Sequence, residues 1–275
     1  MVISNNIAGL CNRIKSLLSA MRIAEFNKDS EVKVDWPFTA AVGECHFTDL
    51  FENENMIIRR PDYPPGATIY SFWRFAILPS DPLPINFSDG NGVRYNNTQR
   101  HTGHTHTDKE GRNIDLEFDR IPEEIRLEYL KQLKKLKIKN NILQEVKNFS
   151  KKFNNNTVSV QIRSWNDDPI KQKLFNINDF YKLMDSMENN NFFVTADTPE
   201  IIEKMKKRYG DKIITRENYK ETMGHRERGQ KQGVIDAMID LLLLSKNKTL
   251  IGTYVSTFSE MSWWFSNCKQ KTYIL

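Results

Sequence analysis

The chain of 275 residues is 39% hydrophobic and 27% charged, which suffices for one large domain or two modest ones with a sizeable core. An aromatic content of 11% excludes a mainly disordered chain. The longest apolar run, 238–244, contains Asp240 and falls short of the ~20 residues that a membrane-spanning helix requires. Because the N-terminus lacks the basic and apolar stretches of a secretory signal, we expect a cytoplasmic protein.

The net charge of +5 suits an anionic partner. A phosphate-bearing ligand is one such partner, and a peripheral contact with the inner face of an anionic membrane is another. A nucleic-acid partner is not expected, because proteins of that class concentrate more positive charge on one face. The three cysteines are scattered and form no C-x-x-C pair, which excludes a disulfide scaffold.

The first part of the chain predicts a tight turn at Gly9, followed by a helix with Asn12 and Arg13 in its first turn. Residues 61–119 are dense in Pro, Gly, Asn, Asp and His, and we expect them to form a loop-rich insertion. The other elements expected here are a strand over 31–36, a helical turn over 48–51, a strand over 67–73 and helical structure over 122–153.

A histidine cluster lies in this insertion, at His101, His104 and His106. The spacing H-x-x-H-x-H in a polar loop differs from that of zinc modules and of the H-E-x-x-H helix, so we expect a solvent-facing loop that binds no metal. The chain also lacks the P-loop, G-x-S-x-G and G-x-G-x-x-G motifs. Their absence argues against P-loop kinases, α/β-hydrolases and ordinary dehydrogenases.

The second half of the chain alternates strands with helices. This alternation predicts an α/β fold with a parallel sheet covered on both faces, and such sheets bind ligands at the carboxyl ends of their strands. The expected strands are 157–162, 191–195, 212–215 and 249–252, and the expected helices are 177–187, 199–209, 233–245 and 257–265.

Arg163 and Asp197 directly follow two of these strands. The Arg163 guanidinium suits the capture of a phosphate or carboxylate, and the alternative is a structural ion pair with Asp167 or Asp168. Asp197 either caps the helix that begins at residue 199 or binds the hydroxyls of a sugar. Both interpretations stay open from position alone.

Asp240 interrupts an apolar helix, and a buried carboxylate needs a partner. The two N–H donors of a guanine edge would satisfy it, and the alternative is a helix face that meets water. Ser256 and Thr257 open the last helix. Their hydroxyls and the free N–H groups of that helix form an anion site, ordinary caps, or both.

Several segments together resemble the GT-B fucosyltransferases, the family of the NodZ-type α-1,6-fucosyltransferases and, more distantly, the protein O-fucosyltransferases. Gln161-Ile162-Arg163 resembles the family's H-[VI]-R strand end, and 195–199 (Thr-Ala-Asp-Thr-Pro) resembles its A-T-D-D-P segment. Residues 233–257 resemble its G-V-I-x-D-[IL]-x-x-L-S helix with the strand and the S-S/T loop that follow. The turn at 9–13 is similar to the G-x-G-N-[RQ] opening of related enzymes.

The resemblance implies an α/β fold of GT-B type, in which two Rossmann-like domains face each other across a cleft. It places an N-terminal acceptor-side domain over 1–150 and a C-terminal nucleotide-sugar domain over 151–275. It also implies an inverting glycosyltransferase that moves L-fucose from GDP-fucose to a glycan hydroxyl, for example that of a lipid-linked saccharide. The family typically needs no metal, so we expect no cofactor beyond the GDP-sugar donor.

By resemblance, Arg163 binds the β-phosphate of the donor and is the catalytic residue. The candidates for the base that deprotonates the acceptor are Asp167, Asp168 and Glu44. The other donor-binding residues that the resemblance implies are Asn12, Arg13, Gln161, Asp197, Asp240, Ser256 and Thr257.

Cys11, Gln161, Ser164 and Thr198 depart from the family's motifs. Because Gln161 and Thr198 lie in donor motifs, one alternative is a glycosyltransferase that uses another nucleotide sugar. The other alternative is a catalytically inactive protein of the same fold that binds a glycan or an anion.

Overall fold

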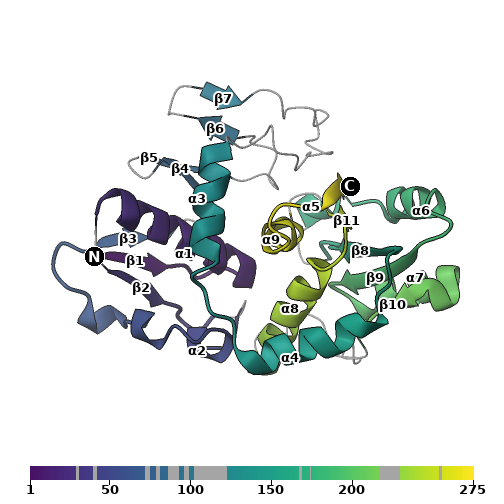
Figure 1. Ribbon diagram of the computed structural model, residues 1–275, viewed down its shortest axis with the longest axis horizontal. Helices are drawn as coiled ribbons and strands as arrows, with labels where there is room; N and C mark the ends of the chain where they lie inside the picture. The colour runs from purple at the N-terminus through teal and green to yellow at the C-terminus, as the bar shows by residue number, and fades with distance from the viewer. Residues whose placement is uncertain are drawn as a thin grey trace.

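The computed structural model describes residues 1–28, 31–39, 42–71, 75–78, 81–85, 93–95, 99–101, 123–166, 169–173, 175–216, 230–253 and 256–275. Within these residues the chain forms two parallel sheets, one from its N-terminal part and one from its C-terminal part (Figure 1). No described helix combines the length and the apolarity needed to cross a bilayer. The expected α/β fold with parallel sheets is therefore confirmed.

The N-terminal sheet has the strand order β2-β1-β3 and is covered by helix α1. Both neighbours run parallel to β1, with Val2 opposite Val32 and Thr68. In α1 the buried side chains recur at three- and four-residue spacings, which is the periodicity that predicted the helix. The bounds are β1 Val2–Asn5, α1 Leu10–Phe26, β2 Val32–Asp35, α2 Phe47–Leu50, η1 Glu54–Met56, η2 Arg60–Asp62 and β3 Thr68–Tyr70.

The insertion expected to be loop-rich contains more regular structure than its sequence indicated. Two antiparallel hairpins follow β3, the first formed by β4 and β5 and the second by β6 and β7. Strand β5 includes Pro82 and Pro84, which donate no backbone hydrogen bond and so hide the strand pattern. The bounds are β4 Phe75–Leu78, β5 Asp81–Ile85, β6 Val93–Tyr95 and β7 Gln99–His101.

The C-terminal sheet is entirely parallel and has the order β10-β9-β8-β11-β12. The strands expected over 157–162 and 249–252 have those bounds in the structure, whereas the last strand was not expected. The bounds are β8 Thr157–Ile162, β9 Asn191–Ala196, β10 Ile213–Ile214, β11 Thr249–Gly252 and β12 Lys271–Ile274.

Helices cover both faces of this sheet, and β8 shows why. Val158 and Val160 join an apolar cluster with residues of α6 and α7, while Ser159 faces the other side and donates a hydrogen bond to the Leu244 carbonyl of α8. The two faces thus follow the two-residue period of a strand. The bounds are α5 Pro169–Gln172, α6 Ile177–Asp185, α7 Pro199–Tyr209, η6 Gly210–Lys212, α8 Lys231–Leu244 and α9 Thr257–Phe265.

The helical segment expected over 122–153 is divided into α3 (Glu123–Leu133) and α4 (Asn140–Phe149), followed by a turn, η5 (Ser150–Lys152). The break occurs where Ile138 forms a β-bridge with Phe51. Helix α4 then packs against α8 beside the C-terminal sheet (Figure 1). One continuous apolar core joins both sheets, so the domain boundary expected at residue 150 stays a prediction.

Candidate functional site

Polar residues gather at the carboxyl ends of β8, β9 and β11. Arg163 follows β8, Asp197 follows β9 and Thr253 follows β11. The Thr253 hydroxyl donates to the Gln161 carbonyl (3.0 Å) and accepts from the Arg163 backbone N–H (2.8 Å). These bonds fix the two strand ends next to each other, at the edge where parallel sheets bind ligands.

The Arg163 guanidinium is held at this edge by an ion pair. Its Nη1 lies 3.0 Å from Asp197 Oδ2, and the other oxygen of that carboxylate accepts from the Ser164 N–H and hydroxyl, both at 2.9 Å. The guanidinium also lies over the ring of Trp165, 4.8 Å from its centroid. The Arg163 side chain is 11% exposed, so it keeps a small accessible surface on a fixed cation.

This arrangement answers one question that position left open. Asp197 caps no helix with its side chain, because α7 takes Thr198 as its N-cap and receives no side-chain hydrogen bond there. Its carboxylate instead orients Arg163. Asp167 and Asp168, the partners considered from the sequence, lie outside the described residues.

The N-terminus of α9 adjoins the same edge. Its N-cap, Ser256, accepts from the Ser259 N–H, and Thr257 is the first helical residue. The Ser259 hydroxyl accepts from the Thr253 N–H and donates to Gln161 Oε1. The Gln161 side chain, expected to bind a ligand, is thus only 5% exposed and ties β8 to α9.

Helix α9 approaches β11 closely at Gly252. A Cβ atom added there would lie 2.8 Å from both Cβ and Oγ of Ser259, closer than packed atoms allow. Only glycine therefore lets Ser259 reach the end of β8. The sequence gives no sign of this role, because Ser259 lies within a helix whose apolar residues dominate the pattern.

Asp240 has the partner that its burial requires. Arg216 donates from Nη1 to Asp240 Oδ1 (3.0 Å) and from Nη2 to Asp236 Oδ1 (2.8 Å). Burial of the Arg216 guanidinium disfavours its charge, but the two carboxylates more than offset this and raise its pKa. Arg216 was not expected at the site. It comes shortly after β10 in the chain, and nothing local in the sequence links it to Asp240.

On the N-terminal side, the structure brings Asn12 and Arg13 to the first turn of α1 as expected, but their side chains differ in placement. Asn12 is half-buried, and its Oδ1 has no hydrogen-bond partner within the described part of the chain. Arg13 is fully buried and donates to Ala8 O and Pro37 O, each at 2.7 Å. Burial lowers the pKa of Arg13 to about 10. Arg13 thus acts as an internal clamp and offers no surface to a ligand here.

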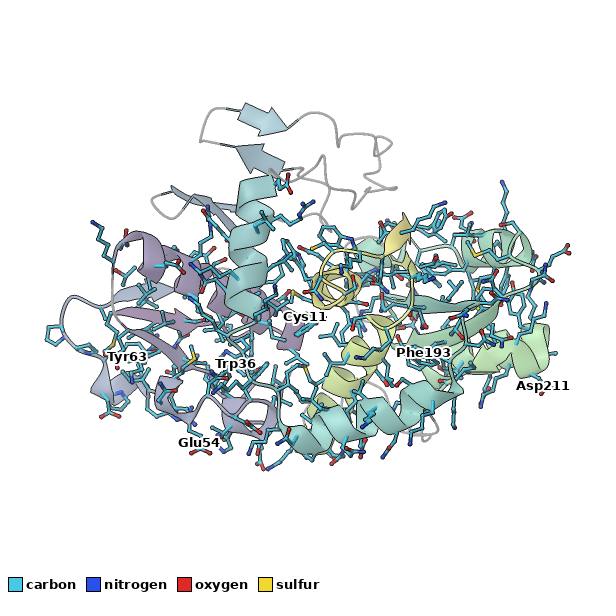
Figure 2. All side chains as sticks on the ribbon, in the orientation of Figure 1. Cys11, Trp36, Glu54, Tyr63, Phe193 and Asp211 are labelled. Atoms are coloured by element: carbon cyan, nitrogen blue, oxygen red, sulfur yellow. The ribbon has the colours of Figure 1, made fainter. Side chains whose placement is uncertain are left out.

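The carboxyl edges of the two sheets face each other. Lys15 of α1 and Glu260 of α9 form a buried ion pair with an N–O distance of 2.8 Å, so the N-terminal parts of both helices lie close together. Cys11 lies where these helices meet (Figure 2). A second pair, Lys231 with Asp49 at 2.5 Å, joins α8 to α2. Residues at the edge of the C-terminal sheet therefore oppose those at the start of α1.

The remaining expected residues lie elsewhere. Glu44 is exposed, while His104 and His106 lie outside the described residues, as does the side chain of His101. No group of three metal-binding side chains occurs in the parts of the chain that the structure describes. The expectation that the histidine loop binds no metal stays a prediction.

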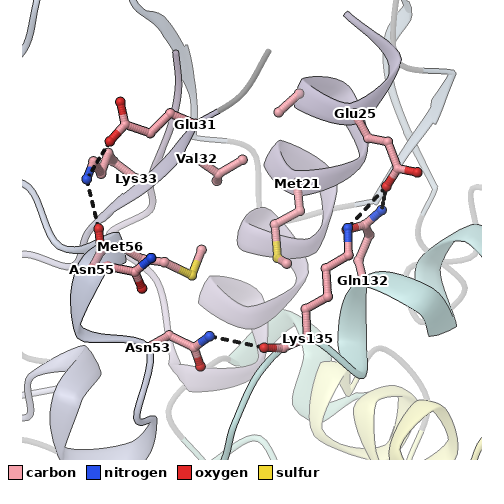
Figure 3. A pocket seen from close by; sticks show the side chains of 11 residues that line it. Met21, Glu25, Glu31, Val32, Lys33, Asn53, Asn55, Met56, Gln132 and Lys135 are labelled. Atoms are coloured by element: carbon pink, nitrogen blue, oxygen red, sulfur yellow. Dashed lines mark hydrogen bonds and ion pairs between the residues drawn. The ribbon is translucent and has the colours of Figure 1, made fainter. Parts of the chain in front are cut away.

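A hollow of about 500 Å³ lies at the other end of α1 (Figure 3). It is lined by Met21 and by charged residues that already pair with one another, such as Lys33 with Glu31 and Lys135 with Glu25. Met21 is eleven residues from the start of the helix, a distance of about 16 Å along its axis. The hollow is therefore separate from the edge that carries Arg163.

Two facing parallel sheets with polar residues at their carboxyl edges define the architecture of a GT-B protein, and the fold is that of the GT-B fucosyltransferases. No family model and no curated protein sequence matches this chain. The chain is similar to solved structures, and because their sequence identity to it is low, this similarity shows the fold alone.

Three solved structures illustrate the likeness. NodZ α-1,6-fucosyltransferase soaked with GDP-fucose has a TM-score of 0.54 and 14% identity, over 95% of this chain and 90% of that one. A mutant of Arabidopsis thaliana FUT1 in complex with GDP has a TM-score of 0.59 and 12% identity, over 99% and 70%. POFUT1 in complex with GDP has a TM-score of 0.53 and 12% identity, over 100% and 98%.

Proposed function

We propose that this protein is an inverting glycosyltransferase that moves L-fucose from GDP-fucose to a glycan hydroxyl. The observation that carries the proposal is the Arg163 guanidinium, held by Asp197 at the carboxyl edge of the C-terminal sheet beside the N-terminus of α9. The fold supports it too, since solved proteins of this fold contain GDP or GDP-fucose.

Arg163 would bind the β-phosphate of the donor. In the reaction the acceptor hydroxyl gives its proton to a base, for which Asp167, Asp168 and Glu44 are the candidates, and its oxygen bonds to the anomeric carbon. The bond from that carbon to the β-phosphate oxygen breaks, so negative charge grows on the departing GDP. A guanidinium fixed in advance by Asp197 stabilises that charge without having to reorganise. Ser256, Thr257 and the N–H groups at the start of α9 would hold further phosphate oxygens. With charge compensation from these groups, the proposal needs no metal.

Asp240 would accept hydrogen bonds from the guanine edge. The carboxylate is already bound by Arg216 in this structure, so guanine would have to share it or displace Arg216. Asn12 would approach the donor from the N-terminal side with its amide, while Gln161 and Arg13 would act by holding Ser259 and the 37–39 loop in place. Because Arg216 occupies the carboxylate proposed to bind guanine, the alternative is a donor with another base or another sugar.

The proposal includes a cytoplasmic location with a peripheral contact to anionic lipid, where a lipid-linked saccharide would serve as acceptor. Its support is a set of exposed lysines on α4 and on the segments that follow α3 and α4, namely Lys134, Lys137, Lys147, Lys151 and Lys152. Such lysines attract an anionic surface. Co-sedimentation with vesicles containing anionic lipid, compared with neutral vesicles, tests this part on its own.

The test of the activity is GDP release from GDP-fucose, with Arg163→Ala as the informative variant. Loss of one charge-stabilising donor lowers kcat by about 10²–10³-fold. Arg208→Ala is the matched control, because Arg208 also pairs with an aspartate but lies on the outer surface of α7. Equal turnover by Arg163→Ala and wild type, with both folded, would contradict the proposal. Turnover of a different nucleotide sugar alone would replace fucose, and binding without any turnover would favour an inactive protein.

A further inference from the structure

Phe38 is an exposed aromatic residue on a loop that is held in place. Its side chain is 50% exposed, although it lies only two residues after the buried Trp36. Arg13 fixes the loop from below, donating to the carbonyl of Pro37 at 2.7 Å and to the hydroxyl of Thr39 at 3.2 Å. A large apolar ring on a loop that a buried arginine holds in place is exposed in a fixed position, as a ligand-binding residue needs to be.

A polar cluster adjoins this ring. His46 contacts Phe38 edge-on, with centroids 4.7 Å apart, and its Nδ1 lies 3.1 Å from Nη2 of Arg59. Because a guanidinium only donates, Nδ1 must accept, which leaves the ring proton on Nε2. Arg59 also reaches Asp35 at 3.4 Å, and Tyr63 donates its hydroxyl to the same carboxylate at 2.8 Å.

The cluster lies at the carboxyl edge of the N-terminal sheet. Asp35 is the last residue of β2 and pairs in register with Asn5, the last residue of β1. This is the edge at which α1 begins, close to α9 of the C-terminal half (Figure 1). His46 caps α2, whose Asp49 forms the ion pair with Lys231 of α8. Phe38 and His46 thus belong to the N-terminal half and lie near its contact with the C-terminal half, which carries Arg163.

We propose that Phe38, His46, Arg59 and Tyr63, held by the buried Asp35, form the acceptor-binding surface and that the acceptor is a neutral saccharide. A pyranose has an apolar C–H face that matches the Phe38 ring and a rim of hydroxyls that both donate and accept hydrogen bonds. His46 and Arg59 supply donors at the rim, and the Tyr63 hydroxyl supplies an acceptor. Asp35 is only 5% exposed and accepts from Arg59 and Tyr63, so it holds these two side chains in place from within. Since the charges of Arg59 and Asp35 balance, the surface favours a neutral sugar. This inference rests on the proposed function, because it names the acceptor side of that reaction.

The test uses two variants with matched controls. Phe38→Ala removes the ring, and Phe38→Trp keeps one. Leu143→Ala is the control, because Leu143 is a similarly exposed apolar residue on α4. Arg59→Gln removes the guanidinium, and Arg208→Gln is its control, because both arginine side chains are 46% exposed and pair with an aspartate.

Wild-type protein with labelled GDP-fucose is first assayed on an array of neutral and acidic oligosaccharides, and the acceptors it labels are then used for KM measurements. Phe38→Ala and Arg59→Gln should each raise the acceptor KM by at least about tenfold, equivalent to ~1.4 kcal/mol. Phe38→Trp and both controls should stay near wild type. Calorimetry with GDP gives a separate readout of the donor site, which these variants should leave unchanged.

Unchanged acceptor KM values in both variants would overturn the inference, and so would labelling of acidic oligosaccharides alone. Donor hydrolysis by the wild type without labelling of any saccharide would also overturn it while leaving the donor site intact. Failure of the wild type to bind GDP or turn over GDP-fucose is a different result. It would refute the proposed function first, and the acceptor role with it.

Discussion

Loss of one partner of the Lys15–Glu260 ion pair should destabilise the whole protein. The two side chains are 0% and 1% exposed, and they connect α1 of the N-terminal sheet to α9 of the C-terminal sheet. When either charge is removed, the other stays buried without its main compensation. Breaking such a pair costs about 3–5 kcal/mol, whereas replacing both partners with apolar residues is often neutral.

The expected magnitudes follow for three variants. Lys15→Met and Glu260→Met should each lower the free energy of unfolding by ~3–5 kcal/mol. For a chain of this size about 2–4 °C of Tm accompany each kcal/mol, so both single variants should melt many degrees below wild type. The double variant should lie much closer to wild type than the sum of the single variants predicts.

Urea unfolding followed by tryptophan fluorescence measures all four proteins of this double-mutant cycle. Arg208→Met provides a control in which a surface ion pair is lost, and it should leave the transition unchanged. Additive costs in the double variant would refute the reasoning, because they would mean that the two charges do not stabilise each other. Single variants with costs below ~1 kcal/mol would refute it as well.

Three further predictions concern packing, acid stability and thiol reactivity. Gly252→Ala should destabilise the protein by about 1–3 kcal/mol in urea, since its Cβ would overlap Ser259, and an unchanged midpoint would contradict the packing argument. Hydrogen bonds, first from Lys131 and then from Gln132 and Lys135, lower the pKa of Glu25 to about 2 from 4.5. The unfolded chain therefore takes up this proton first as the pH falls, so the stabilisation is complete above about pH 4.5 and is lost toward pH 2. In Glu25→Gln the free energy of unfolding should depend less on pH between those values, and the loss at pH 7 should be less than ~1 kcal/mol because the carboxylate is exposed. A pH profile of unfolding that runs parallel to that of the wild type would contradict this. Burial raises the pKa of the thiols of Cys11, Cys45 and Cys268, that of Cys45 to about 12. A disulfide reagent at pH 8 should therefore label no thiol in the native protein and three after unfolding, and labelling of the native protein would contradict this.

The elements of the C-terminal half were predictable because their patterns are strong and local. The strand 157–162 and the helix 257–265 combine apolar periodicity with clear polar boundaries, and the structure has both at those bounds. The last strand, 271–274, was missed because it is short and pairs only at the sheet edge, beside β11. The division of 122–153 into two helices depends on the bridge from Ile138 to Phe51, a contact between distant segments.

For the site, position predicted which residues come together but not what their side chains bind. Arg163 and Asp197 follow neighbouring strands, so their proximity follows from the parallel sheet, whereas their ion pair does not. The burial of Asp240 indicated a partner, yet nothing in the sequence selects Arg216 from 40 lysines and arginines. Arg13 was expected to face a ligand, and only the path of the 37–39 loop shows that its guanidinium is enclosed.

Calorimetry of nucleotide binding tests the central claim most directly. GDP, UDP, CMP and dTDP are titrated in EDTA into wild-type protein and into Arg163→Ala. We predict that GDP binds the wild type at least tenfold more tightly than the other three and that Arg163→Ala weakens this binding. A preference for UDP or dTDP would contradict GDP-fucose as the donor, and no binding of any of the four would contradict the donor site at Arg163.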